Sequence, residues 1–305
     1  MAASISDVVT GLWPNVPSTV EKLSGGITNS NYKVAVGDEI FVVRVAGDRT
    51  VLLGIDRQSE VAAGRLAAAL GIAPEVVLAD FPQGVIVTRF IVGRPVEPGE
   101  VGSEPVLADI AAALKSIHNA GSVTATFDAY KIVPRYYELA AADGVAPPFD
   151  FARMAATLGK ISRVRPWRGE ALCHNDLLNS NLIHDGAVRI VDWEYAGMGD
   201  PFFDLGNLAV NHGFSKEEDA GLLGHYFGQV TEADLALLAL FKLVSEAREA
   251  MWGVLQLALS SLDVDFAAYA RQHAEGYFRL LADLDFERTL SVASARRPGP
   301  SDPQA

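Results

Sequence analysis

The pattern of apolar and polar positions changes near residue 92. Before it, residues 31 to 45, "NYKVAVGDEIFVVRV", predict two short strands that meet at a Gly-Asp turn. Residues 56 to 70 predict a helix that begins at an aspartate and stops at Gly71. The stretch "PEVVLADFPQGVIVTRFI" predicts two more strands around a proline-containing turn. The first part of the chain is therefore expected to form an antiparallel sheet that carries one helix.

After the Pro- and Gly-rich stretch "VGRPVEPGE", the helical period dominates. "VLADIAAALKSIHNAG" predicts one amphipathic helix, and "EADLALLALFKLVSEAREAMWGVLQLAL" predicts a long helix or a broken pair. Between them, "ALCHNDLL" predicts a strand that leads into a loop, and "NLIHDGAVRIVDW" predicts a hairpin that turns at Asp185 and Gly186. We therefore expect a first lobe at residues 1–92, a second at 93–290 and a disordered, Pro-rich tail at 291–305.

Composition narrows the function classes. Half of the 305 residues are hydrophobic, which indicates a globular protein, and the formal net charge is -13 at pH 7. This acidity argues against nucleic acid or a membrane as the partner and is compatible with a cationic small molecule, although general solubility explains it equally well. The single cysteine, Cys173, cannot form an internal disulfide. Because we find neither a membrane-spanning run nor a secretory signal, we expect a cytoplasmic protein.

The stretch "LCHNDLLNSNLIHDGAVRIVDWEYAG", residues 172 to 197, places several polar groups in an apolar frame. Asp176 precedes Asn181, and Asp192 follows an apolar strand. Mg²⁺ prefers oxygen ligands and commonly takes one or two from the protein, a role that suits Asn181 and Asp192. Asp176 could then accept a proton from a substrate hydroxyl. The alternative is a loop whose Asp and Asn residues only cap turns, which the ordered set makes less attractive.

Two weaker signals precede this stretch. In "LSGGITNSNYKV", residues 23 to 34, Gly25 and Gly26 would let backbone N–H groups approach phosphate oxygens, although the same letters also suit an ordinary hairpin turn. Arg44 ends a predicted strand, and Glu60 lies on the next helix. A pairing between them could aim the arginine at phosphates, whereas an exposed pair would contribute almost nothing.

Taken in this order, the three signals resemble the protein-kinase-like small-molecule phosphotransferases, the family that contains choline/ethanolamine kinases and aminoglycoside phosphotransferases. "CHNDLLNSNLI" resembles the catalytic loop of that family and "IVDWEYAG" its metal-binding segment. "LSGGITNSNYKV" resembles the phosphate-covering loop, "FVVRV" the strand with the phosphate-binding cation, and "TRFIVGRPV" the hinge that receives adenine. The resemblance spans roughly residues 20 to 280, and its most specific parts are the catalytic loop and "DWEYAGMGDPFFDLGN".

The resemblance implies an α+β, protein-kinase-like fold with two lobes: a small antiparallel-sheet N-lobe and a mainly helical C-lobe, with ATP and Mg²⁺ in the cleft. It implies that Asp176 is the catalytic base, with Asn181 and Asp192 as metal ligands. Few side chains suffice, because phosphoryl transfer needs mainly positioning and charge neutralisation. The implied nucleotide-binding residues comprise the loop at 25–30, a paired cation and the hinge backbone: Gly25, Gly26, Asn29, Ser30, Arg44, Glu60, Arg89, Phe90 and Ile91.

Two departures from protein kinases point to the small-molecule branch. Arg44 stands where protein kinases have lysine, and in this it resembles the choline-kinase branch, which uses arginine. Trp193-Glu194 follows the metal-binding aspartate in place of Phe-Gly. The segment "VDWEYAGMGDPFFDLGN" is most similar to the bacterial choline-kinase type. The implied acceptor is a small cationic amino alcohol, choline or ethanolamine, and the sequence leaves a homodimer open.

Aromatic faces and negative charge recognise a quaternary ammonium group. The resemblance implies an acceptor site built from Glu194, Tyr195, Trp252, Phe266 and Tyr269. Ordinary core packing is the alternative for each aromatic residue. Leu255 stands where the family helix often carries a second aromatic residue, so this acceptor site would have one aromatic face fewer.

Several other functions remain as alternatives at this point. Within the family, the acceptor could be an aminoglycoside or thiamine. A nucleotide-binding module without catalysis would also explain the departure at Arg44. A metal-dependent phosphohydrolase would use His174, Asp176, His184 and Asp185 as a metal cluster. The resemblance instead implies that His174 braces the catalytic loop, that His118 has a structural role, and that His184 and Asp185 lie in an exposed turn.

Overall fold

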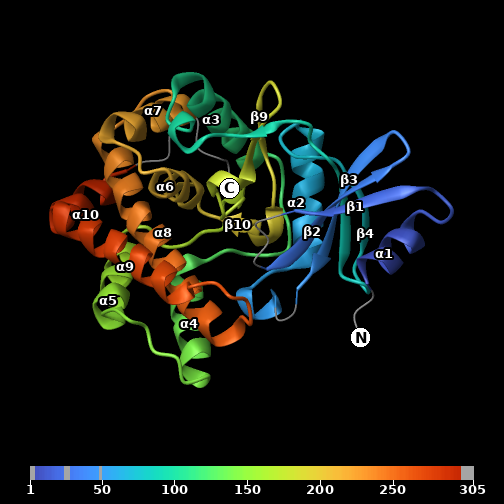
Figure 1. The fold of residues 1–305 in the computed structure, drawn as a ribbon. Coiled ribbons are helices and arrows are strands. Elements are labelled where there is room, and N and C mark those ends of the chain that lie inside the picture. The colour runs from blue at the N-terminus through green and yellow to red at the C-terminus, as the bar shows by residue number, and fades with distance from the viewer. Residues whose placement is uncertain (1–3, 24–27, 48–49, 297–305) are drawn as a thin grey trace.

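The computed structural model describes residues 4–23, 28–47 and 50–296, which form a sheet-rich lobe and a helical lobe (Figure 1). Within these residues the N-lobe holds a five-stranded antiparallel sheet in the order β1-β2-β3-β5-β4. The strands are β1 (Ser18–Lys22), β2 (Asn29–Val36), β3 (Glu39–Ala46), β4 (Val76–Asp80) and β5 (Val85–Arg89). The predicted strands and the turn at Gly37 and Asp38 are confirmed, and β1 was not predicted.

The two faces of this sheet contact different helices, because side chains alternate across a strand. Val34 and Val43 are fully buried on one face, which packs against Val8 and Val9 of α1 (Ile5–Leu12), a helix that the pattern did not predict. The other face, with Arg44, is covered by α2 (Arg57–Ala69). The predicted start of α2 is confirmed, because the side chain of Asp56 caps the helix by accepting the N–H of Ser59 at 2.6 Å. Alternation therefore points Arg44 toward the interlobe space.

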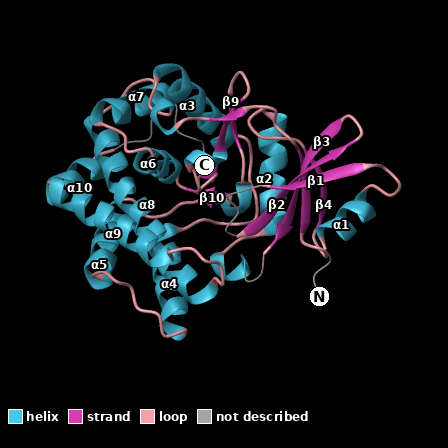
Figure 2. Ribbon diagram, viewed as in Figure 1, coloured by secondary structure: helices cyan, strands magenta, loops and turns pink. Residues whose placement is uncertain are grey.

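The C-lobe is mainly helical, as Figure 2 shows. Its centre is α8 (Glu232–Leu259), a single 28-residue helix, which settles the question of one helix or two. α8 packs against α4, α6, α9 and α10, so polar residues in its middle are also buried. The other helices are α3 (Glu104–His118), α4 (Ala129–Ala142), α5 (Phe151–Val164), α6 (Pro201–Asn211), α7 (Lys216–Phe227), α9 (Phe266–Asp283) and α10 (Phe286–Ser294).

Short strands connect the lobes and carry the polar stretch. They are β6 (Arg94–Pro95), β7 (Ala171–Cys173), β8 (Leu182–His184), β9 (Val188–Ile190) and β10 (Gly197–Gly199). β8 and β9 form the predicted hairpin, with Asp185 and Gly186 exposed at its turn. We retain residue 92, between β5 and β6, as the proposed lobe boundary.

The expectation of a disordered tail from residue 291 is wrong for its first residues. α10 continues to Ser294, because Leu290 and Ala293 are spaced by three positions and bury one face of the helix in the C-lobe core. Residues 297–305 lie outside the described part of the chain. Among the described helices, none combines the length and the apolar character that crossing a bilayer requires.

Candidate active site

The loop between β7 and β8 is fixed by a buried carboxylate beneath it. Asp204 of α6 is fully buried and accepts the N–H of His174 at 2.8 Å and that of Asn175 at 2.7 Å. Its Oδ2 also lies 2.9 Å from Nε2 of His118. Asn175 has a left-handed backbone (φ 68°), which its amide stabilises by donating to the carbonyl of Tyr195 at 3.0 Å. The residues of the loop that directly precede Asp176 are therefore held in place by hydrogen bonds to Asp204 and to the Tyr195 carbonyl.

His174 braces this loop and does not face a metal site. Its Nε2 donates to the carbonyl of Val191 at 3.0 Å, so Nδ1 can accept the N–H of Asp176 at 3.2 Å. Burial lowers the pKa of His174, which favours this neutral form. Asp185 lies in the exposed hairpin and pairs with Arg189. These placements remove the basis of the phosphohydrolase alternative.

Cys173 forms a compact buried group with His118 and Asp204, the set of three potential ligand side chains found in the described residues. The polar atoms of this group are already committed. His118 Nδ1 lies 2.6 Å from the hydroxyl of Tyr226, and both oxygens of Asp204 accept hydrogen bonds from the loop. Burial raises the pKa of Cys173 well above its ordinary value, which disfavours the thiolate. The group is therefore structural.

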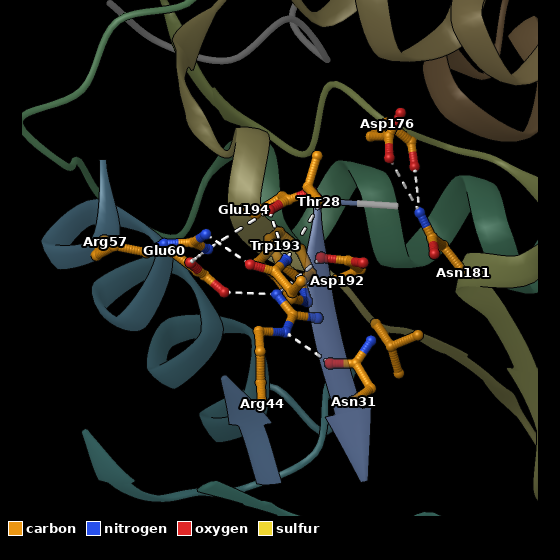
Figure 3. Close-up of polar contacts among 12 residues, drawn as sticks. Thr28, Asn31, Arg44, Arg57, Glu60, Asp176, Asn181, Asp192, Trp193 and Glu194 are labelled. Atoms are coloured by element: carbon orange, nitrogen blue, oxygen red, sulfur yellow. Dashed lines mark hydrogen bonds and ion pairs between the residues drawn. The ribbon is translucent and has the colours of Figure 1, made fainter. Parts of the chain in front are cut away.

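Asp176 is the third residue of this loop, and its carboxylate faces one amide nitrogen of Asn181 and one guanidinium nitrogen of Arg248. Its Oδ2 accepts a hydrogen bond from Nδ2 of Asn181 at 3.3 Å (Figure 3), and its Oδ1 lies 3.5 Å from Nη1 of Arg248. Burial raises the pKa of Asp176 well above its ordinary value, and the positive charge of Arg248 opposes this shift. Asp176 lines a small cavity, where a carboxylate can accept the proton of a bound hydroxyl.

Asn181 and Asp192 offer oxygens to the same region. Asn181 donates Nδ2 to the backbone carbonyl of Asp176 at 2.8 Å, which leaves its amide oxygen on the opposite side. Asp192 has a left-handed backbone (φ 66°) directly before the short 3₁₀ helix Trp193–Tyr195, and its carboxylate lies 2.8 Å from Arg44. Both residues line two adjoining cavities. One carboxylate and one amide oxygen on a shared wall are a donor set that fits Mg²⁺.

The larger cavity, of about 390 Å³, lies between the lobes. Leu23, Val42, Val61, Ile86, Ile183 and Val191 give it apolar walls, and the three predicted hinge residues also line it. The N–H groups of Arg89 and Phe90 are used within the sheet, by the carbonyls of Glu75 at 2.9 Å and Ile40 at 3.0 Å. Of these three described hinge residues, only Ile91 shows no such backbone bond from its N–H. Among the backbone N–H groups of this predicted hinge, that of Ile91 is therefore the donor left for adenine.

Arg44 and Glu60 form the predicted pair across the strand and the helix. Nη1 of Arg44 lies 2.6 Å from Glu60 and 2.8 Å from Asp192 (Figure 3). Burial alone would lower the pKa of Arg44, but Asp192 and Glu60 together raise it, so the guanidinium stays charged. Arg57, which the pattern did not single out, pairs with the other oxygen of Glu60 at 2.6 Å. Glu60 therefore holds two cations at the edge of the larger cavity.

The predicted phosphate-covering loop is described only in part. Gly25 and Gly26 lie outside the described residues. Thr28 and Asn29 donate hydrogen bonds to the two carboxylate oxygens of Glu194, the latter at 2.8 Å, and Arg57 approaches the same carboxylate. Burial raises the pKa of Glu194 to about 7. Ser30 pairs with Val45 within the sheet and lines neither of the two cavities described here.

The smaller cavity, of about 80 Å³, brings Asp176 together with the predicted aromatic residues Trp252, Tyr195 and Tyr269. The Trp252 ring is inclined by 63° to that of Tyr269, with ring centres 5.3 Å apart, and Nε1 of Trp252 donates to the hydroxyl of Tyr195 at 2.8 Å. Phe266 does not line the cavity. It packs behind Trp252 in the core, so core packing is the correct interpretation of this residue.

A profile of the phosphotransferase enzyme family matches residues 19–241, well over half of the chain. The chain belongs to this family. Protein LicA of Haemophilus influenzae is 26% identical and aligns over 85% of this chain and 79% of its own length. Ethanolamine kinase 2 of Homo sapiens is 29% identical and aligns over 88% of this chain and 77% of its own length. The solved structure of a choline/ethanolamine kinase family protein from Mesorhizobium loti has 28% identity and a TM-score of 0.79, and covers 95% of this chain and 99% of its own. The predicted two-lobed, kinase-like fold is confirmed.

The sequence analysis missed two buried charged residues at the smaller cavity of this phosphotransferase, Arg248 and Glu249. Both are buried in α8 and line the smaller cavity. A signal for them was present in the sequence, since the polar residues at 245, 248 and 249 lie close to one turn apart in the mainly apolar middle of this helix. Buried polar residues need polar partners, and for Arg248 one of these partners is Asp176.

Proposed function

We propose that this phosphotransferase moves the γ-phosphate of ATP to the hydroxyl of choline or ethanolamine. One observation carries the proposal: Asp176, Asn181 and Asp192 lie where a nucleotide-sized cavity adjoins a small cavity with aromatic and acidic walls. The names of the relatives, LicA and ethanolamine kinase, support the same acceptor class. A cytoplasmic location and a homodimer stay predictions.

The residues divide the reaction between them. The apolar walls of the larger cavity and the N–H of Ile91 would hold adenine, and Arg44 would contact the phosphates. Asn181 and Asp192 would bind Mg²⁺, which supplies charge neutralisation on the phosphate oxygens. As the acceptor oxygen bonds to the γ-phosphorus and the bond to the β-phosphate oxygen breaks, Asp176 takes the hydroxyl proton.

The smaller cavity favours an amino alcohol over an aminoglycoside. Trp252 and Tyr269 offer aromatic surface that suits an ammonium group, and Glu194 adds an acidic side chain. A multi-ring aminoglycoside needs more room than this cavity provides. The presence of the base, both oxygen ligands and a charged Arg44 also disfavours a nucleotide-binding module without catalysis.

The deciding experiment incubates the protein with ATP, Mg²⁺ and one of four acceptors: choline, ethanolamine, thiamine or kanamycin. We expect the mass of a monophosphate ester with choline or ethanolamine. Phosphorylation of kanamycin or thiamine alone would replace the proposed acceptor. ATP binding measured by calorimetry, without any phosphorylated product across the panel, would contradict the proposed catalysis.

We expect Trp252→Leu to raise the KM for choline by about tenfold, because it removes the aromatic face that a quaternary ammonium contacts. Steady-state kinetics with choline measure the effect. Trp252→Phe is the matched variant and should retain much of the affinity. An unchanged KM in Trp252→Leu would show that the cation binds elsewhere.

We expect Arg44→Gln to raise the KM for ATP by about tenfold or more, since a charged guanidinium at the phosphates would be lost. The control is Arg94→Gln, at an exposed arginine on β6 that pairs with Glu100 and lines neither cavity. Equal KM values for ATP in the two variants would remove Arg44 from the nucleotide site.

A further inference from the structure

Arg248 is a buried cation in the wall of a cavity that is proposed to receive a cation. Its side chain is 1% exposed, and Nη1 lies 2.6 Å from Glu249 and 3.5 Å from Asp176. Within the described chain, its Nε and Nη2 have no hydrogen-bond partner. Burying a guanidinium with two unsatisfied nitrogens is costly. Packing alone does not explain why an arginine occupies this position.

Arg248 lies against the groups near Asp176 that would otherwise attract an ammonium group. Those groups are the carboxylates of Asp176 and Glu249 and the aromatic face of Tyr195, whose ring centre lies 4.5 Å from the guanidinium carbon. Because like charges brought together in a buried site repel strongly, a second cation is disfavoured there. An ammonium group can still bind against the aromatic rings of Trp252 and Tyr269, which line the same cavity.

We propose that Arg248 is a positioning residue that sets the direction in which the acceptor binds. Its charge repels the ammonium end from Asp176, so the hydroxyl is the end that reaches that carboxylate. Repulsion of the wrong orientation is a recognised source of specificity. The inference rests on the proposed function, because it requires an acceptor with a cation at one end and a hydroxyl at the other.

The matching experiment compares choline with 3,3-dimethylbutan-1-ol, which has the same shape without the charge. In Arg248→Gln, choline can also bind in reverse with its cation beside Asp176, and this binding is unproductive. We therefore expect both kcat and KM for choline to fall by about tenfold, with a much smaller change in kcat for the neutral alcohol. Arg248→Lys keeps the charge and should restore most of the kcat for choline.

Arg165→Gln is the matched control for loss of a partly buried arginine that pairs with two carboxylates. Arg165 pairs with Glu170 at 2.8 Å and with Asp200 at 2.6 Å, and it lines neither cavity. This variant should lose stability in thermal unfolding without changing the preference between the two alcohols. If Arg248→Gln fails to fold, the double variant Arg248→Gln/Glu249→Gln, which keeps the net charge of the cluster, must still lower kcat and KM for choline, by a smaller factor, because the Asp176 carboxylate remains.

A binding measurement separates this inference from the proposed function. Tetramethylammonium cannot accept phosphate, and its Kd by calorimetry should fall by about tenfold in Arg248→Gln, because the repulsion is gone. An unchanged or higher Kd overturns the inference, as does an equal loss of kcat for both alcohols or a lysine variant that behaves like glutamine. Absence of turnover of every cationic alcohol by the unaltered protein contradicts the proposed function instead, and the tetramethylammonium result then decides the inference.

Discussion

Replacement of Asp176 by asparagine is expected to lower kcat by about 10³-fold. Asparagine keeps the size of the side chain, but it cannot take the hydroxyl proton. The Kd for ATP should change little, because Asp176 lines the smaller cavity and is absent from the walls of the larger one. Steady-state kinetics give kcat, and calorimetry gives the Kd.

Asp185→Asn is the control for this variant. Asp185 has the same side chain in the same polar stretch, but it lies in the exposed turn between β8 and β9. It should retain the kcat of the unaltered protein. If Asp176→Asn retains more than about a tenth of that kcat, Asp176 is not the proton acceptor.

A change at Asp204 is expected to have the second large effect, on stability and activity together. In Asp204→Asn, one carboxylate oxygen becomes an NH₂ group that faces either the N–H of Asn175 or that of His174. Two buried donors then face each other, which should lower the free energy of unfolding by about 3 kcal/mol. Because the loop that carries Asp176 loses its anchor, kcat should fall by about 10²-fold. Urea unfolding and steady-state kinetics measure the two effects.

Asp38→Asn provides the comparison, since Asp38 is exposed in the turn between β2 and β3. Its free energy of unfolding should stay within about 0.5 kcal/mol of the unaltered protein. A similarly small change in Asp204→Asn would mean that the loop is held in place by other contacts.

The features that the sequence predicted well depend on neighbours in the chain. Two runs on either side of the turn at Gly37 and Asp38 predicted β2 and β3, and the Asp56 cap predicted the start of α2. The pairing of Arg44 with Glu60 followed because that strand and that helix are consecutive. The order of Asp176, Asn181 and Asp192 predicted one site, because the hairpin between them is short and folds back on itself.

The features that were missed depend on contacts between distant segments. α1 is an eight-residue helix whose burial depends on a sheet formed later in the chain. Phe266 and Tyr269 lie on the same helix, but only the packing of α9 on α8 decides that Tyr269 reaches the cavity and Phe266 does not. The position of Arg248 beside Asp176 joins residues 72 positions apart, which no local pattern specifies.

Glu194 belongs to the segment that follows Asp192, yet its carboxylate is bound by Thr28, Asn29 and Arg57, all from the N-lobe. A rotation of the two lobes away from each other would have to break these bonds. Thr28 and Asn29 also form part of the wall of the smaller cavity. Under the proposed function, a lobe movement that admits or releases the nucleotide would therefore also change the acceptor cavity.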